Sequence, residues 1–202
     1  ANPRRRIHHQ SILHHMLNRI NWVPKYYMVT DDLVAFDLKE DIPKMVKNVD
    51  KAFFPLIHPS NKSFYKFIQD RENIFWLDAG YPNFRKDLPK CGINNTVINA
   101  SIQIAIFMGY KNICFLGVDL SYQKQAIRKK SSRDWVADED DINHFDSKYF
   151  SKGKKYHDPQ PEKMKERLLE AKNKFGDEIN FVNCGVGGNL DIFTRKDLQS
   201  FL

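Results

Sequence analysis

Cysteine is scarce in this chain of 202 residues. The three cysteines, Cys91, Cys114 and Cys184, are far apart and form no Cys-x-x-Cys pair. A disulfide framework needs an even, patterned set of cysteines, and a thiolate zinc site needs closely spaced ones, so we expect neither. Free cysteines are typical of reducing compartments, and we therefore expect a cytoplasmic location.

Long apolar runs are also missing. No stretch approaches the roughly 20 apolar residues that a transmembrane helix needs. The opening residues, ANPRRRIHHQ, lack the apolar core that follows the basic residues of a signal peptide. We interpret residues 1–15 as a basic N-terminal segment and residues 16–202 as one domain without internal repeats.

Several motifs that would define a site are absent. The sequence contains no Gly-x-Ser-x-Gly, no P-loop and no His-Glu-x-x-His, and GVGG at 185–188 is not a dinucleotide fingerprint. The acidic run DEDD at 138–141 is typical of a solvated surface. His8, His9, His14 and His15 lack the cysteine or carboxylate spacing of a zinc site. We therefore expect no bound metal.

Positive charge is in excess, with 32 Lys and Arg against 25 Asp and Glu and a net charge of +7. The excess favours an anionic partner such as a nucleotide, a phosphorylated sugar, nucleic acid or an anionic membrane face. A merely basic protein without such a partner fits equally well. Nucleic acid ranks last, because the charge is dispersed and no nucleic-acid motif is present.

Short apolar strands alternate with helical patterns, which is typical of an α/β fold with a parallel sheet. We predict strands at 25–31, 52–57, 73–78, 111–119 and 179–185, and helices at 39–49, 94–110 and 161–176. The apolar run at 111–119 predicts a strand buried on both faces. A helix that leads directly into such a strand is half of a doubly wound sheet.

Residues 121–157 form a predicted lid. Residues 121–143 are charged and aperiodic, so we expect a long loop there. Residues 143–160 hold His144, Tyr149, Tyr156 and His157 without any apolar periodicity, so we expect them outside the core.

Polar residues follow the predicted strands, where ligands of open parallel sheets bind. Asp31 follows the first strand, and Asp119 and Tyr122 follow the strand at 111–119. Asn95 and Thr96 begin the helix at 94–110, and a helix start favours a phosphate. Each residue has a plainer alternative as a cap, a turn or a surface side chain, so the hypothesis of a binding site depends on their convergence.

Several stretches resemble a known domain family: LNRINWVPKYYMVTDDLVAFD, TVINASIQIAIFMGYKNICFLGVDLSY and VNCGVGGNLDIFTRKDLQSF. They are similar to the cell-surface polysaccharide branch of the 6-hydroxymethylpterin diphosphokinase-like proteins. The helix and strand unit also resembles sialyltransferases of glycosyltransferase family 42. The resemblance implies a Rossmann-like doubly wound, mostly parallel sheet. That family opens with a strand and a Gly-Asn-Gly-Pro-Ser loop, which we expect to be missing here.

The resemblance also implies roles for individual residues. Asn18 and Asp31 stand near the positions of two nucleotide-binding asparagines, and Thr96 and Tyr122 stand near phosphate-binding positions. His144 or His157 would be the general base, with Tyr156 as a further substrate-binding candidate. We prefer His144, because it comes first in the lid. The family uses CMP-activated sialic acid and needs no metal.

We therefore expect metal-independent, inverting transfer of a CMP-activated nonulosonic sugar from a nucleotide-sugar donor to a glycan acceptor of the cell surface. Two alternatives stay open. One is a pyrophosphokinase that uses Mg²⁺ with ATP through carboxylates such as Asp31, Asp119 or the 138–141 run. The other is a binding module without catalysis in polysaccharide assembly. In each case the protein could associate peripherally with the inner face of the cytoplasmic membrane.

Overall fold

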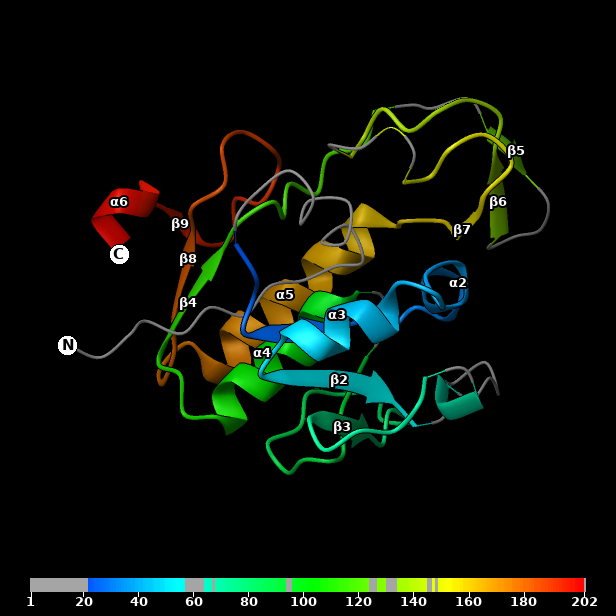
Figure 1. Cartoon of the computed structure of the whole chain (residues 1–202). Coiled ribbons are helices and arrows are strands. Elements are labelled where there is room, and N and C mark those ends of the chain that lie inside the picture. Colours follow the sequence, from blue (N-terminus) through cyan, green and yellow to red (C-terminus); the bar gives the residue numbers. More distant parts are fainter. Residues whose placement is uncertain are drawn as a thin grey trace.

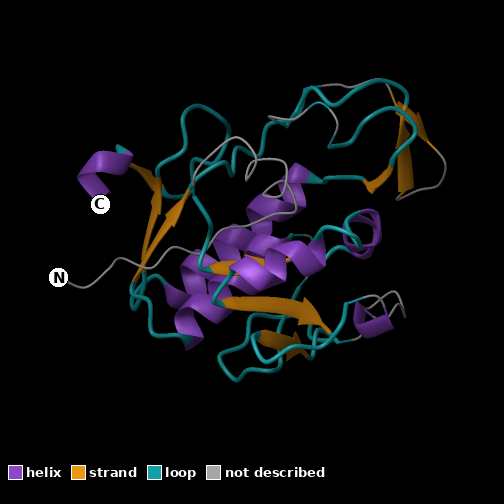
Figure 2. Cartoon of the chain, viewed as in Figure 1, coloured by secondary structure: helices purple, strands orange, loops and turns teal. Residues whose placement is uncertain are grey.

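The computed structural model describes residues 22–56, 64–66, 68–93, 96–123, 127–129, 134–144, 147 and 149–201, with only the backbone described at 127–129. Its elements in chain order are β1 (Tyr26–Met28), α2 (Asp32–Asp37), α3 (Ile42–Asn48), β2 (Lys51–Pro55), η1 (Phe64–Lys66), β3 (Ile74–Leu77), α4 (Val97–Phe107), β4 (Asn112–Phe115), β5 (Ile127–Lys129), β6 (Asp134–Ala137), β7 (Lys155–His157), α5 (Pro161–Phe175), β8 (Asn180–Asn183), β9 (Thr194–Arg195) and α6 (Leu198–Phe201). Figures 1 and 2 show the helices α3, α4 and α5 grouped in the middle, between separate sets of strands.

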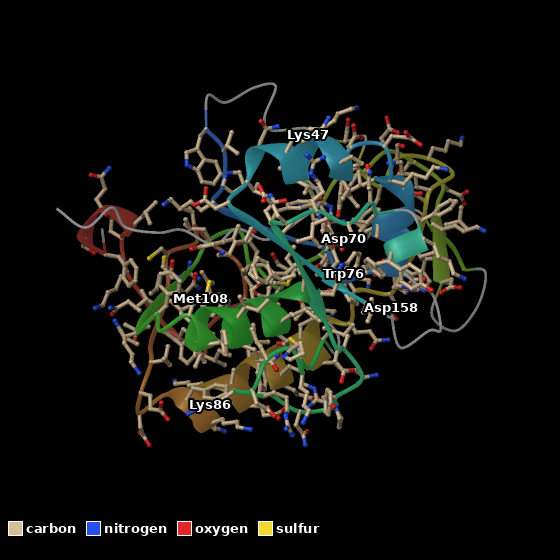
Figure 3. The ribbon with its side chains drawn as sticks, turned by 60° about the horizontal axis from the view of Figure 1, so that its bottom comes forward. Lys47, Asp70, Trp76, Lys86, Met108 and Asp158 are labelled. Carbon is tan, nitrogen blue, oxygen red and sulfur yellow. The ribbon has the colours of Figure 1, made fainter. Side chains whose placement is uncertain are left out.

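The first sheet has the parallel order β1-β2-β3. Alternate residues of its strands point to opposite faces, as strand geometry requires. Tyr27 and Phe54 pack in the cluster that includes residues of α3, whereas Phe53 packs in the cluster that includes residues of α4. Figure 3 shows the two helices, labelled at Lys47 and Met108, on opposite sides of β2. Pro55 ends β2, where its missing N–H does least harm.

The second sheet, β4-β8-β9, is also parallel. Its Phe115 and Phe181 stack at 6.1 Å between ring centroids and pack with Leu168 and Phe175 of α5. α5 therefore covers a face of this sheet and also contacts α4. The prediction that the strand at 111–119 is buried on both faces is wrong, because β4 is shorter and only Phe115 of its four residues is buried.

The α/β class is confirmed, and two of the three sheets, each of three strands, are parallel. Pairing among the described strands gives three separate small sheets, however, and does not by itself establish one continuous doubly wound sheet. Among the same residues, no helix has the length together with the apolar character needed to cross a bilayer. Cys91, Cys114 and Cys184 are thiols and form no disulfide with one another.

A buried glutamine joins α4 to the irregular segment that precedes it. Gln103 is 1% exposed, and its Oε1 atom accepts hydrogen bonds from the backbone N–H groups of Arg85 and Gly92. Its Nε2 atom donates to the carbonyl oxygens of Gly92 and Asn99. The side chain thus supplies hydrogen-bond partners to backbone groups of a segment that forms only isolated β-bridges.

Two surface contacts support the outer strands and α5. Trp76 of β3 donates from Nε1 to Asp70, 3.0 Å away, and the two residues are neighbours in Figure 3. Lys86 lies beside α5 in the same view and forms an ion pair of 2.6 Å with Glu178.

The lid, residues 121–157, contains regular structure where a long loop was predicted. β5 and β6 lie within 121–143, and with β7 they form an antiparallel sheet. The sequence hides these strands because they are only three and four residues long and carry charged side chains. Trp135 of β6 packs edge-on against Tyr156 of β7, with 6.0 Å between their ring centroids. Figure 1 shows this sheet projecting beside α2, away from the other strands.

One side chain joins the two ends of the first part of the lid, residues 123–143. Asn143 accepts a hydrogen bond of 2.7 Å from the backbone N–H of Gln123 and donates one of 3.2 Å to its carbonyl oxygen. These two hydrogen bonds resemble the pair that residues of neighbouring strands exchange, and they hold Gln123 and Asn143 next to each other.

Candidate functional site

The antiparallel pairing of the lid places one histidine opposite a carboxylate. His157 of β7 pairs with Asp134 of β6 in register, and cross-strand partners of this kind have side chains within reach of each other. The Nδ1 atom of His157 lies 3.1 Å from the Oδ1 atom of Asp134.

Two further carboxylates approach the same ring from the start of α2. Asp31 is the N-cap of α2, and its Oδ1 atom accepts from the backbone N–H groups of Leu33 and Val34 at 2.9 and 3.0 Å. Asp32 is the first residue of the helix and is 3% exposed. The Nε2 atom of His157 lies 3.4 Å from Oδ1 of Asp32 and 3.8 Å from Oδ2 of Asp31.

These contacts determine the charge of His157. Its hydrogen bond with Asp32 raises the pKa of the imidazole, and the charges of Asp31, Asp32 and Asp134 add to this effect, whereas partial burial opposes it. The ring is therefore stabilised as a cation between three carboxylates. Both of its nitrogens are engaged.

His144 has a different arrangement. Its Nδ1 atom lies 2.7 Å from Oδ2 of Asp141, whose side chain is 1% exposed. Asp141 also accepts from the backbone N–H groups of Asn143, His144 and Phe150. Burial alone would raise the pKa of Asp141, but the hydrogen bonds from His144 and the backbone hold it below its ordinary value. Among the described residues, the Nε2 atom of His144 has no hydrogen-bond partner.

An aromatic cluster surrounds His144. The ring of His144 lies 4.7 Å from that of Tyr149 and 5.3 Å from that of Phe150, between centroids. Phe150 in turn stacks on Tyr156 at 4.8 Å. The expectation that this stretch lies outside any core is wrong for Tyr149 and Tyr156, which are 8% and 9% exposed. They form a small core of the lid itself.

The end of β4 approaches the base of the lid. Tyr122 exposes 41% of its surface, yet burial around its hydroxyl, followed by the charges of Asp119 and Asp141, raises its pKa. The hydroxyl therefore stays neutral and can donate a hydrogen bond. Asp119 lies against the glycine turn after β8, where a Cβ atom on Gly188 would come within 2.6 Å of the Asp119 carbonyl oxygen.

The structure brings several of the predicted site residues together. Asp31 meets His157, and Tyr122 lies close enough to Asp119 and to Asp141, the partner of His144, for both charges to act on its hydroxyl. Thr96 caps α4 by accepting from the backbone N–H of Ile98 at 3.3 Å, which is its plainer role. Asn18 and Asn95 lie outside the described residues.

Three carboxylates of these centres were not among the predicted site residues. Asp32 follows the first predicted strand together with Asp31, but only Asp31 was selected, and Asp134 is recognisable only once the pairing of β6 with β7 is known. Asp141 belongs to the acidic run that was interpreted as a solvated surface, and that interpretation is wrong for this residue. Its spacing from Asn143 and His144 is the one local signal, because aspartates often accept hydrogen bonds from N–H groups two and three residues ahead.

The cluster at the start of α2 bears on the expectation of no metal. One ligand atom each from Asp31, Asp32 and His157 lie within 4.8 Å of one another. The fold and the site together define a mixed α/β protein with two aspartate–histidine centres in and beside its lid. No family model, curated protein or solved structure matches the chain.

Proposed function

We propose that this chain transfers a sugar from a nucleotide-activated donor to a hydroxyl group of a glycan, through a Rossmann-like domain. The donor we favour is a CMP-activated nonulosonic acid, as the resemblance to sialyltransferases implies. The observation that carries the proposal is the pair of Asp141 and His144, in which a buried carboxylate holds one ring nitrogen and the other is left for a substrate.

Inverting transfer requires a base for the acceptor hydroxyl. With Asp141 accepting the proton on Nδ1, the lone pair of His144 is on Nε2. This atom takes the acceptor proton as the acceptor oxygen bonds to the anomeric carbon. The bond from that carbon to the phosphate oxygen breaks, and the nucleotide phosphate leaves with the electron pair.

The departing phosphate needs hydrogen-bond donors and positive charge. Tyr122 offers a neutral hydroxyl near Asp119 and Asp141. Thr96 begins α4, whose first N–H groups favour an anion. Lys152 and Lys155 of the lid are exposed and add positive charge. Because a lid also limits the access of water, transfer competes better with hydrolysis.

His157 is the weaker candidate for the base. Carboxylates engage both of its nitrogens, so neither nitrogen is left for the hydroxyl group of a substrate. In this proposal His157 holds the lid against α2. The proposal also places the reaction in the cytoplasm or at the inner face of the cytoplasmic membrane, and it requires no metal for the transfer step.

The test compares His144→Ala with His157→Ala, with release of CMP from CMP-sialic acid as the readout. His144→Ala should lower turnover about 10²–10⁴-fold with donor affinity nearly unchanged. His157→Ala should have a smaller effect. Equal and undiminished rates for both variants would contradict catalysis by the lid and favour a binding module.

Donor identity is tested separately by calorimetry with CMP, UMP and ATP. Binding of CMP supports the proposal. Tight binding of ATP only in the presence of Mg²⁺, without binding of CMP, would replace it with the pyrophosphokinase hypothesis.

A further inference from the structure

We propose that Asp31, Asp32 and His157 bind a divalent transition-metal cation, which fastens the lid to α2. This inference does not depend on the transferase activity, and the cation would act on the position of the lid and not in the transfer step.

The ligand atoms are spaced as such an ion requires. The Nε2 atom of His157 lies 3.4 Å from Oδ1 of Asp32 and 3.8 Å from Oδ2 of Asp31. Bonds of about 2.0–2.1 Å in a tetrahedral site place neighbouring ligand atoms roughly 3.4 Å apart. One of these separations already fits, and the other exceeds the ideal value by a few tenths of an ångström. The third, between the ligand atoms of the two aspartates, is within 4.8 Å.

The second nitrogen of His157 provides an independent indication. Histidines that bind metals almost always donate their other N–H to a carboxylate, which fixes the tautomer and the ring orientation. Asp134 occupies that position, 3.1 Å from Nδ1 of His157. With the proton on Nδ1, the Nε2 lone pair points toward the carboxylates of Asp31 and Asp32. That arrangement favours a positive charge between them, which a second proton on the ring or a metal ion would supply.

The donor set selects the class of metal. One imidazole nitrogen and two carboxylate oxygens suit Zn²⁺, Co²⁺, Mn²⁺ or Fe²⁺, whereas Ca²⁺ and Mg²⁺ favour sets made only of oxygen. Asp32 is 3% exposed, and burial of a carboxylate is costly without a nearby cation. Three protein ligands leave room for a water molecule in the fourth position.

The ligands come from two parts of the fold. Asp31 and Asp32 begin α2, and His157 ends β7, which packs against α2. Asp134 belongs to the neighbouring strand β6. A bound ion would therefore join the antiparallel sheet of the lid to α2. The alternative, a proton on the His157 ring shared with the aspartates, would join them more weakly.

The experiment is calorimetry with Co²⁺ on the full chain after dialysis against a chelator, together with the visible absorption of bound Co²⁺. His8, His9, His14 and His15 can also bind Co²⁺. The quantity compared is therefore the number of Co²⁺ ions bound by the wild type and by His157→Ala. We expect one additional equivalent in the wild type, with the absorption of a nitrogen and oxygen site. Asp32→Asn should remove the same equivalent.

Two more variants separate ligation from general charge. Asp134→Asn should weaken the additional site about 10–100-fold without abolishing it, because Asp134 acts through His157. Asp158→Asn is the matched control, since Asp158 follows His157 directly but its carboxylate accepts from the backbone N–H of Gln160. It should leave the Co²⁺ affinity unchanged. Circular dichroism verifies that each variant is folded.

The proposal is wrong if the wild type and His157→Ala bind the same number of Co²⁺ ions with the same affinity. It is also wrong if folded Asp32→Asn keeps the additional equivalent. In either case a proton, and not a metal, lies between His157 and the two aspartates. Because the readout is metal binding, a lack of sugar transfer would not affect this conclusion.

Discussion

Replacing Asp141 by alanine should destabilise the protein far more than replacing any of its acidic neighbours. Oδ1 of Asp141 accepts from the backbone N–H groups of Asn143 and His144 at 2.8 and 3.2 Å. Oδ2 accepts from Nδ1 of His144 at 2.7 Å and from the backbone N–H of Phe150 at 3.2 Å. A hydrogen bond to a charged group contributes about 1.5–3 kcal/mol, and such contributions to one carboxylate are not additive. We therefore expect a loss of about 3–5 kcal/mol in the free energy of unfolding.

This loss should depend on pH in one direction. The pKa of Asp141 in the folded protein lies below its ordinary value. The unfolded chain therefore binds the proton more readily, and the stabilisation is present above the unfolded pKa of about 3.9. It disappears as the pH falls through the folded pKa. The difference between the wild type and Asp141→Ala should thus be largest near neutral pH and shrink in acid.

The assay is denaturant unfolding followed by circular dichroism at neutral and acidic pH. Asp138→Ala is the matched control, because Asp138 lies in the same acidic run but is exposed. Similar losses for the two variants at neutral pH would refute the reasoning. A difference that stays constant on acidification would refute the part that concerns the charge of Asp141.

Three further outcomes follow. Asp141→Asn should lower CMP release about 10²–10⁴-fold, because an amide in that place favours the His144 tautomer with its proton on the catalytic nitrogen. Gln103→Met should lower the free energy of unfolding by about 2–4 kcal/mol, measured by thermal unfolding, since a side chain of similar shape leaves buried backbone groups unpaired. Gly188→Ala should destabilise more than Gly187→Ala in denaturant unfolding: both glycines have φ of 75°, but only at Gly188 would a Cβ atom meet backbone, 2.6 Å away.

Local signals in the sequence predicted the body of the fold well. Thr96 was one of two predicted caps of α4 and does cap it, and Pro161 begins α5 as expected. Strands β1, β2, β3 and β8 lie within their predicted ranges or extend one residue beyond them. Each of these elements carries enough apolar residues, or a clear terminal residue, to be recognised alone. β5 and β6 are too short to be recognised in this way, and they are stabilised as strands by their mutual pairing and by β7.

The candidate site was predictable only in part. The rule that ligands bind beyond strand ends selected Asp31, Asp119 and Tyr122, and the composition of the lid selected both histidines. The partners of His157 depend on contacts that a linear pattern does not contain. His157 and Asp32 are 125 positions apart in the chain and meet only because β7 packs against α2. Asp141 is buried because the lid folds upon itself, and no periodicity of apolar residues in the sequence predicts this burial.

The side-chain closure at Asn143 and Gln123 has a consequence for how this protein can vary through evolution. Two hydrogen bonds from the amide of Asn143 hold it next to Gln123. The distance between these two residues therefore does not depend on how many residues lie between them. Lengthening a closed loop is also inexpensive, at about 0.6 kcal/mol for each doubling. Insertions between Gln123 and Asp134 should therefore leave the parallel sheets undisturbed.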